Sequence, residues 1–195
     1  EAGKQVKQSA KVGDAPQAKV AIIRDGLTRE IEFRTEHGNV LEVVQHNKAL
    51  EQKYSAQAGI KKLTYEYELV SSNMNKVIYQ PGEPDQIMHK YIYDADNRLH
   101  EVFTSRDDIN WDRDAKYFYY DHGPLARIER ADKQVQGMDY FYTINGWVKG
   151  ANSDALDINN DAGKDGAMTN AYNSSYNNLH GWFAKDAMAY SLNYY

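Results

Sequence analysis

One pattern constrains the fold more than any other: pairs of apolar or aromatic residues, separated by a single residue, recur along the chain. The five doublets are Ile31/Phe33, Tyr65/Tyr67, Tyr91/Tyr93, Tyr117/Tyr119 and Tyr140/Tyr142. Their second members are 34, 26, 26 and 23 residues apart. Successive residues of a β-strand point to opposite faces, so a spacing of two places both side chains of a doublet on one face.

A turn residue and then an apolar residue follow each doublet. Counted from the second member, three copies have these residues at plus four and plus six: Asn97 and Leu99, Gly123 and Leu125, Gly146 and Val148. The two earlier copies carry one extra residue, with Gly38 and Ser72 at plus five and Val40 and Met74 at plus seven. Asn and Gly tolerate the positive φ that tight hairpin turns demand. Each copy therefore predicts a strand, a tight turn and a return strand.

This repeat predicts an all-β fold. A lone hairpin is marginal in water, so we expect the hairpins of residues 20–152 to stack edge to edge into one curved or spiralling antiparallel sheet. Residues 1–19 are polar and hold too little apolar area to offset ordering, which predicts an arm or linker. Residues 153–195 are interpreted as a loop and a closing segment. Residues 46–58 are the best candidate for a helix.

The composition narrows the function classes. The chain has 16 Tyr against 5 Phe and 3 Trp, and tyrosine suits positions where one ring face packs and the hydroxyl reaches a polar partner. The net charge is -5 and the basic residues are spread along the chain, which argues against a nucleic-acid partner. The absence of Cys excludes disulfides and thiolate zinc sites. No apolar run reaches membrane-spanning length, so no membrane span is expected.

Residues 91–102 (YIYDADNRLHEV) resemble a known repeat. They match the pattern Y-x-Y-D-x-x-N/G-R-L-x-x-V, which is that of the YD or RHS (rearrangement hotspot) repeat, and residues 119–128 (YYDHGPLARI) are a looser copy. Residues 117–152, with HGPLAR, VQGMDYFYT and INGWVKGAN, resemble RHS proteins of Bacteroidetes-type bacteria. The final FAKDAMAYSLNYY is similar to the start of the RHS-associated core, and the whole resemblance spans roughly residues 28–195.

The resemblance implies a β-sheet strip wound in a spiral into a hollow cocoon. In toxin members of the family this shell encloses a variable C-terminal toxin, and the chain is secreted or displayed at the bacterial cell surface. The expected partners are then the remainder of the same long polypeptide and its enclosed cargo domain. Five hairpins are too few to close a shell, and the family's self-cleavage motif is not visible. We therefore expect the chain to be part of a longer polypeptide.

The polar residues of the 91–102 stretch allow two interpretations. Asp94, Asp96 and Asn97 could bind Ca²⁺ through their oxygens. Alternatively, Asp96 and Asn97 shape the turn through side-chain to backbone hydrogen bonds while Asp94 caps the strand end. The repeat favours the turn, because oxygen ligands do not recur as a set at the Asp94 position. The other copies have Arg34, Glu68, Tyr120 and Thr143 there.

Residues 157–166 (DINNDAGKDG) place oxygens at alternate positions, as calcium loops do. They depart from the EF-hand pattern, with Ala162 at the sixth position and Met168 at the twelfth. We therefore expect a solvent-exposed loop without a metal site, with weak cation binding as the alternative. The six His residues are scattered, and neither a nucleophile motif nor a phosphate-binding glycine loop occurs. No cofactor and no catalytic residue is expected, so the chain is predicted not to be an enzyme.

Two functional hypotheses remain. The first is a non-enzymatic structural segment of an RHS/YD-repeat shell that encapsulates and helps deliver a polypeptide cargo such as a C-terminal toxin. The alternative is a cell-surface adhesion or carbohydrate-binding module that meets surface glycans or secretion machinery. Tyr stripes with Trp111, Trp147 and Trp182 could stack on sugars, and exposed Trp in loops would favour this alternative. The structural positions of the repeat are Phe33, Tyr65, Tyr67, Tyr91, Tyr93, Asn97, Leu99, Tyr117, Tyr119, Gly123, Leu125, Tyr140, Tyr142, Gly146 and Val148.

Overall fold

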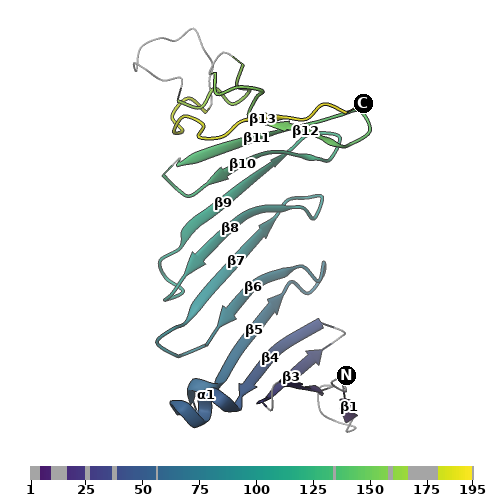
Figure 1. Cartoon of the computed structure of the whole chain (residues 1–195), viewed down its shortest axis with the longest axis vertical. Coiled ribbons are helices and arrows are strands. Elements are labelled where there is room, and N and C mark those ends of the chain that lie inside the picture. Colours follow the sequence, from purple (N-terminus) through teal and green to yellow (C-terminus); the bar gives the residue numbers. More distant parts are fainter. Residues whose placement is uncertain are drawn as a thin grey trace. The chain divides into compact units, whose positions relative to one another are not determined.

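The computed structural model describes most of the chain and divides it into two compact units (Figure 1). The first unit is Glu1–Tyr91 with Ser105–Asn110, and the second is Ile92–Thr104 with Trp111–Tyr195. Side chains are described from residue 39 onward, except that of Gln57. The described backbone covers residues 5–9, 17–24, 27–36, 39–55, 57–133, 135–157, 160–166 and 180–194.

In the first unit the strands pair antiparallel in chain order. A short helix, α1 (Lys48–Lys53), and a 3-10 turn, η1 (Gln57–Gly59), connect the fourth and fifth strands. Asn47 begins the helix, because its side chain accepts a hydrogen bond from the Ala49 N–H. The strands are β1 (Gln5–Ser9), β2 (Gln17–Arg24), β3 (Leu27–Glu36), β4 (Asn39–Asn47), β5 (Ile60–Tyr67), β6 (Met74–Tyr79) and β7 (Ile87–Tyr93), whose last residues belong to the second unit.

In the second unit the strands again pair antiparallel in chain order, from β8 to β13. A long insertion, residues 152–189, separates the last two strands, and we call it the β12–β13 insertion. Its described parts are residues 152–157, 160–166 and 180–189. The strands are β8 (Leu99–Ser105), β9 (Asp112–Tyr119), β10 (Leu125–Arg130), β11 (Gln136–Tyr142), β12 (Val148–Ala151) and β13 (Tyr190–Ser191).

The predicted fold class is confirmed: the described residues are all-β apart from α1 and η1, and consecutive strands form antiparallel hairpins. The helix expected within residues 46–58 is present but shorter, and none of its residues is buried. Closure into a cocoon stays a prediction.

The N-terminal segment differs from the arm predicted for residues 1–19. Strand β1 lies inside it and pairs with β2 along its whole length, from Gln5 opposite Ala21 to Ser9 opposite Gln17. Backbone pairing satisfies the main-chain donors and acceptors without any large apolar side chain. The polar composition of this segment therefore does not prevent it from joining the sheet.

Burial among the described side chains is unusual, since buried polar side chains outnumber buried apolar ones there. Most described strand residues are half-buried rather than buried. Hydrogen bonds and ion pairs must therefore fix the positions of many of these side chains. The buried apolar residues are Val77, Met88, Ala115, Ala151 and Phe183, and the buried polar ones are Gln80, Ser105, Arg127, Glu129, Asn152, Asp161 and Asp165.

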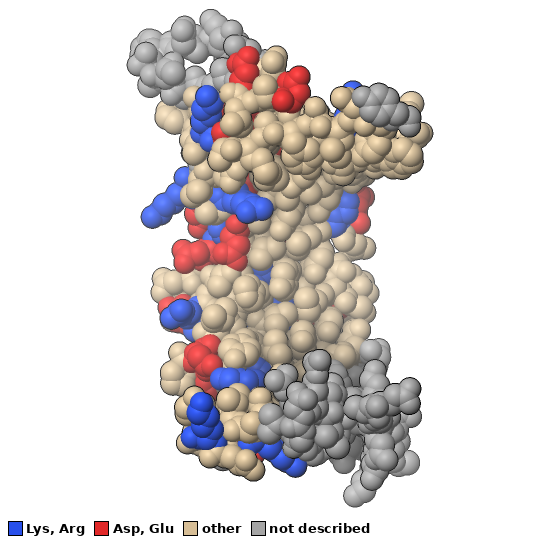
Figure 2. All heavy atoms as spheres, viewed as in Figure 1, with Lys and Arg blue, Asp and Glu red and all other residues tan. Residues whose placement is uncertain are grey.

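The described surface mixes both signs of charge. On the face drawn in Figure 2, Lys and Arg lie beside Asp and Glu rather than in separate patches. Within the part of the chain that the structure describes, no helix has the length and apolar character needed to cross a membrane.

Candidate functional site

The hairpin turns close in one shared way. The Asp94 N–H donates to the Arg98 carbonyl at 2.9 Å, and the Asp94 carbonyl accepts from the Asn97 N–H at 3.1 Å. The same two bonds form around the residue after the doublet in three other copies, at Glu68, Tyr120 and Thr143. The turn residues all have positive φ, as these turns require: 60° at Ser72, 60° at Asn97, 112° at Gly123 and 81° at Gly146.

The second tyrosine of a doublet lies opposite the apolar return residue. A β-bulge stands directly beside each of these pairs, so it aligns the two side chains as the strand enters the turn. The pairs are Tyr67 with Met74, Tyr119 with Leu125, and Tyr142 with Val148.

The first copy does not share this register. Val40 pairs with Thr35, and Phe33 pairs with Val43. The bulge of this hairpin lies between Arg34 and Thr35, so β3 continues beyond the doublet before the chain turns. The predicted equivalence of Phe33 with the later tyrosines is therefore wrong in register. Its predicted turn residue, Gly38, lies outside the described residues.

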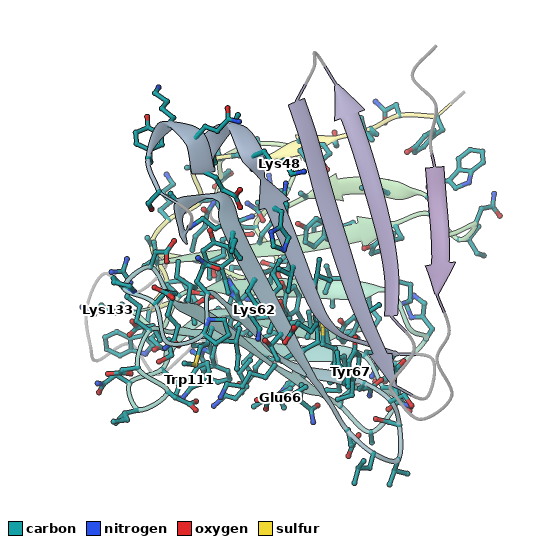
Figure 3. The ribbon with its side chains drawn as sticks, turned by 90° about the horizontal axis from the view of Figure 1, so that it is seen from below. Lys48, Lys62, Glu66, Tyr67, Trp111 and Lys133 are labelled. Carbon is teal, nitrogen blue, oxygen red and sulfur yellow. The ribbon has the colours of Figure 1, made fainter. Side chains whose placement is uncertain are left out.

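Tyrosine hydroxyls join neighbouring hairpins. The Tyr67 hydroxyl (labelled in Figure 3) donates to the Val40 carbonyl at 3.0 Å, and the Tyr119 hydroxyl donates to the Leu99 carbonyl at 2.7 Å. In both cases the acceptor is the return residue of the preceding hairpin. Tyr194 donates to the Val148 carbonyl at 2.6 Å in the same manner. The segment around β13 therefore meets β12 as the first strand of a further hairpin would.

Asp94 is the residue that shapes its turn. Its Oδ1 accepts from the N–H groups of Asp96 and Arg98, both at 2.9 Å, and its Oδ2 accepts from the Arg98 Nε at 2.8 Å. Burial raises the pKa of Asp94, but the hydrogen bonds from Arg98 outweigh it and leave the pKa lowered. The turn-shaping hydrogen bonds predicted for the Asp96 side chain are thus made by Asp94, while Asp96 is exposed and Asn97 supplies the positive φ of the turn. The Arg98 guanidinium lies 4.6 Å from the Tyr119 ring centre.

The two faces of the sheet differ in the second unit. Residues directly opposite one another share a face, so Tyr117, Ile128 and Met138 lie together. The other face carries the alternate residues of the same strands. There Arg127 lies opposite both Phe118 and Asp139. Tyrosine doublets therefore mark one face, and buried charges mark the other.

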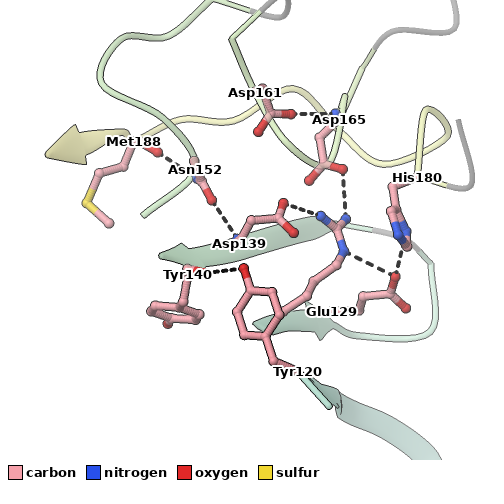
Figure 4. Close-up of polar contacts among 10 residues, drawn as sticks. Tyr120, Glu129, Asp139, Tyr140, Asn152, Asp161, Asp165, His180 and Met188 are labelled. Atoms are coloured by element: carbon pink, nitrogen blue, oxygen red, sulfur yellow. Dashed lines mark hydrogen bonds and ion pairs between the residues drawn. The ribbon is translucent and has the colours of Figure 1, made fainter. Parts of the chain in front are cut away.

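A buried charge cluster stands on that second face, and we define it as Arg127, Glu129, Asp139, Asp165 and His180 (Figure 4). Arg127 is only 3% exposed. Its Nη1 donates to Asp139 at 2.5 Å, its Nη2 to Asp165 at 2.7 Å and its Nε to Glu129 at 3.3 Å. His180 Nδ1 lies 3.0 Å from the Glu129 carboxylate. The cluster joins β10, β11 and the β12–β13 insertion.

Burial changes the titration of the cluster. It raises the pKa of Asp139 to about 6, with the charges of Asp165 and Asp161 acting in the same sense and Arg127 opposing. Burial lowers the pKa of His180, and the positive Arg127 adds to this. The exposed loop expected at residues 157–166 is wrong for two of its three acids, whereas Asp157 is exposed as expected. Asp161 and Asp165 are 5% and 2% exposed, because Arg127 draws the insertion onto the sheet.

Asn152 fixes the start of the insertion. Its Oδ1 accepts from the Asp139 N–H at 2.9 Å, and its Nδ2 donates to the Met188 carbonyl at 2.7 Å (Figure 4). It is almost fully buried and has a φ of 62°. Sequence reasoning missed this residue and Arg127, because nothing in the repeat pattern marks either one.

A cleft of about 530 Å³ opens in the second unit, and its lining contains none of the charge-cluster residues. Gly150 pairs with Phe141, and a Cβ at Gly150 would lie 2.6 Å from the Tyr190 carbonyl oxygen, so the absence of a side chain lets β13 approach β12. Trp147 and Trp182 are 57% and 61% exposed, whereas Trp111 is half-buried. The cleft lining combines aromatic rings with polar groups: Tyr120, His122, Phe141, Tyr142, Thr143, Ile144, Lys149, Gly150, Ser153, Asp154, Tyr190 and Ser191.

Among the described residues, no three His, Asp or Glu side chains form a ready-made metal centre. No protein-family model matches the chain, and no curated protein matches it. The candidate site is therefore defined by its geometry: interlocked hairpins, a buried charge cluster and an aromatic cleft.

Proposed function

We propose that this chain is a non-enzymatic structural segment of an RHS/YD-repeat shell that encapsulates a polypeptide cargo, such as a C-terminal toxin, and helps to deliver it. It would act as a piece of wall within a longer secreted or surface-displayed bacterial polypeptide. The enclosing wall would keep proteases away from the cargo and the cargo away from the producing cell.

The observation that carries this proposal is the bond between successive hairpins. A tyrosine hydroxyl reaches back to the return-strand carbonyl of the preceding hairpin at Tyr67, Tyr119 and Tyr194. Because the bond is made from one repeat to the next, it can extend through any number of repeats. A wall needs such an interaction, while a single catalytic site does not.

Electron microscopy and limited proteolysis of the full-length polypeptide that contains this chain test the proposal. We expect hollow particles and an internal domain that resists protease until the shell is denatured. Tyr93→Ala, in the central doublet, should open the shell and expose the cargo. Tyr54→Ala should not, because Tyr54 is exposed and lies outside the repeats. Solid or open particles whose cargo is cleaved as fast as the free domain would refute the proposal.

The cleft favours a second candidate function, carbohydrate binding at a cell surface. Sugars stack on aromatic rings and hydrogen-bond to nearby carboxylates, hydroxyls and amines. Tyr120, Phe141, Lys149 and Asp154 offer this combination around the cleft. A glycan array is the direct test, with Asp154→Ala expected to abolish any signal and Asp121→Ala, an exposed acid of the neighbouring turn, expected to keep it. An array without hits would exclude this second function.

A further inference from the structure

The β12–β13 insertion holds more buried negative charge than the described bases around it can balance. A small cavity of about 10 Å³ lies among its acids, and we call it the acidic cavity. Its lining includes Asp157, Asp161, Asp165 and Asp186, with Lys185 as the one basic residue. The volume corresponds to a single water molecule or ion.

Within the described part of the chain, three residues that line the acidic cavity each have one buried carboxylate oxygen without a hydrogen-bond partner. These oxygens are Asp161 Oδ1, Asp165 Oδ2 and Asp186 Oδ1. The other oxygens of the first two carboxylates are engaged, since Asp161 Oδ2 accepts from the Asp165 N–H and Asp165 Oδ1 accepts from Arg127. Asp161 and Asp165 are more than nine-tenths buried, so bulk water does not solvate the orphaned oxygens. Burial of an unpaired carboxylate is expensive, which indicates a missing partner.

The neighbouring bases do not supply that partner. The Arg127 guanidinium already contacts Glu129, Asp139 and Asp165, so it faces three carboxylates with one charge. Lys185 is exposed, and within the described residues it makes no ion pair. Asp161 and Asp186 therefore face each other without a basic side chain to separate their charges.

Two agents can neutralise such a pair: a proton or a cation. A water molecule could donate hydrogen bonds to the orphaned oxygens, but it would leave the excess charge in place. A shared proton removes one charge and is favoured at low pH. A divalent cation removes two charges and accepts several oxygen ligands at once.

We propose that the acidic cavity binds one divalent cation, of the Ca²⁺ type, through the carboxylates of Asp161, Asp165 and Asp186. These carboxylates do not form a ready-made set of ligands, so binding requires their side chains to rotate toward the cavity. Ca²⁺ suits this arrangement better than Mg²⁺, because Ca²⁺ tolerates irregular coordination while Mg²⁺ demands near-ideal octahedral geometry. The mismatch with the EF-hand pattern does not weaken the proposal, since Asp186 comes from outside the 157–166 loop.

A bound cation would have a structural consequence for the insertion. Asp161 and Asp165 belong to the first part of the insertion, and Asp186 belongs to its last part. A bound cation would hold these two parts together beside the charge cluster. It would thereby fasten the insertion, and through Asn152 and Met188 the approach to β13, onto the second unit.

Isothermal titration calorimetry and thermal unfolding of the chain at pH 8, in chelator, Ca²⁺ or Mg²⁺, test the proposal. We expect about one Ca²⁺ per chain and a rise in Tm of about 5 °C at a concentration near one hundred times the Kd, with a smaller rise in Mg²⁺. Absence of heat and of a Tm shift with both ions would overturn it.

Variants separate a cation site from simple repulsion between acids. Asp186→Asn should abolish Ca²⁺ binding and the Tm shift, while the variant itself stays folded because the repulsion is relieved. Asp161→Asn should do the same, but it also alters the hydrogen bond to the Asp165 N–H. Asp154→Asn is the matched control, since Asp154 is an exposed acid of the same insertion outside the acidic cavity, and it should bind Ca²⁺ as the parent does. Unchanged Ca²⁺ binding by Asp186→Asn would refute the assignment of the site.

Discussion

The hairpin repeats and the β12–β13 insertion are held in place by different physics. In the four repeats whose turns the structure describes, each turn reuses two backbone hydrogen bonds and a residue with positive φ, and the contacts join residues close in sequence or one repeat apart. The insertion is held by Arg127, whose partner Asp165 is 38 residues away and almost fully buried. The periodic part is therefore locally encoded, while the insertion depends on a few long-range contacts, of which the one between Arg127 and Asp165 is the most buried.

The largest expected effect comes from removing the centre of the charge cluster. Arg127→Met leaves three acids near one another without a counter-charge, which should lower the free energy of unfolding by about 3–5 kcal/mol. Urea denaturation measures this directly. Arg130→Met is the matched control, because Arg130 ends the same strand and is exposed, and it should change stability by less than about 0.5 kcal/mol. Equal losses of stability in Arg127→Met and Arg130→Met would contradict the claim that the charge cluster holds the insertion in place.

The next largest effects are expected from two glycines, one beside the charge cluster and one in a hairpin turn. A Cβ at Gly137 would clash with Arg127 and Asp165, so Gly137→Ala should destabilise the chain by about 2–3 kcal/mol. Gly146 has open space around it and matters only for its φ of 81°, so Gly146→Ala should be milder, at about 1–2 kcal/mol. Denaturation curves of both variants decide the order. A larger loss at Gly146 would mean that the turns, and not the cluster, limit stability.

The pH dependence follows from the same buried acids. Burial, with neighbouring carboxylates acting in the same sense, raises the pKa of Asp139 to about 6 and that of Asp186 to about 7. The folded chain then binds more protons than the unfolded chain between about pH 4 and 7. The rise in the pKa of Asp139 from 3.8 to about 6 should by itself lower the free energy of unfolding by roughly 3 kcal/mol as the pH rises across that window, and the more exposed Asp186 should add to this fall.

His180 opposes this pH effect, and the variant Asp154→Asn provides a control for it. The lowered pKa of His180 adds stability as the pH rises, so the difference between variants is more informative than the parent curve. In chelator, Asp186→Asn should flatten the decline between pH 5 and 7, whereas Asp154→Asn should leave it unchanged. Parallel curves for the parent and Asp186→Asn would show that this carboxyl does not titrate in the window.

The smallest effect is expected in the repeats. Tyr119→Phe removes the hydroxyl that donates to the Leu99 carbonyl but keeps the ring beneath Arg98, so it should cost about 1 kcal/mol. Tyr120→Phe is a useful comparison, since its hydroxyl donates to the Tyr140 carbonyl rather than to a return residue. In the full-length polypeptide, only Tyr119→Phe should loosen the contact between successive hairpins, as seen by amide exchange at Leu99 and its neighbours.

The sequence predicts the locally encoded features well. Spacing of two and turn residues such as Asn97 and Gly146 specify strands and turns through short-range sterics alone. The sequence predicts that Asp94 caps the strand end and that Asp96 and Asn97 shape the turn through side-chain to backbone hydrogen bonds. In the structure Asp94 makes such bonds, because composition does not say which side chain reaches the backbone. The first copy is displaced because a bulge near Thr35 shifts the register, and a doublet does not reveal where a bulge lies.

The charge cluster could not be predicted in the same way. Arg127 stands in a looser copy of the repeat. Its acidic partners come from its own strand, from the next strand and from an insertion with no counterpart in other copies. Polar residues such as Asp161 and Asp165 are usually exposed, so the exposed loop was the natural expectation. The expected exposure does not occur because Asp165 pairs with Arg127, a contact that the sequence does not reveal.

Hydrogen exchange followed by mass spectrometry, comparing the parent with Arg127→Met, tests the central claim most directly. If the repeats are locally encoded and the insertion depends on the charge cluster, the described parts of the insertion should lose amide protection in the variant. The hairpin formed by β5 and β6 should keep its protection. Loss of protection in both regions together, or in neither, would contradict the account.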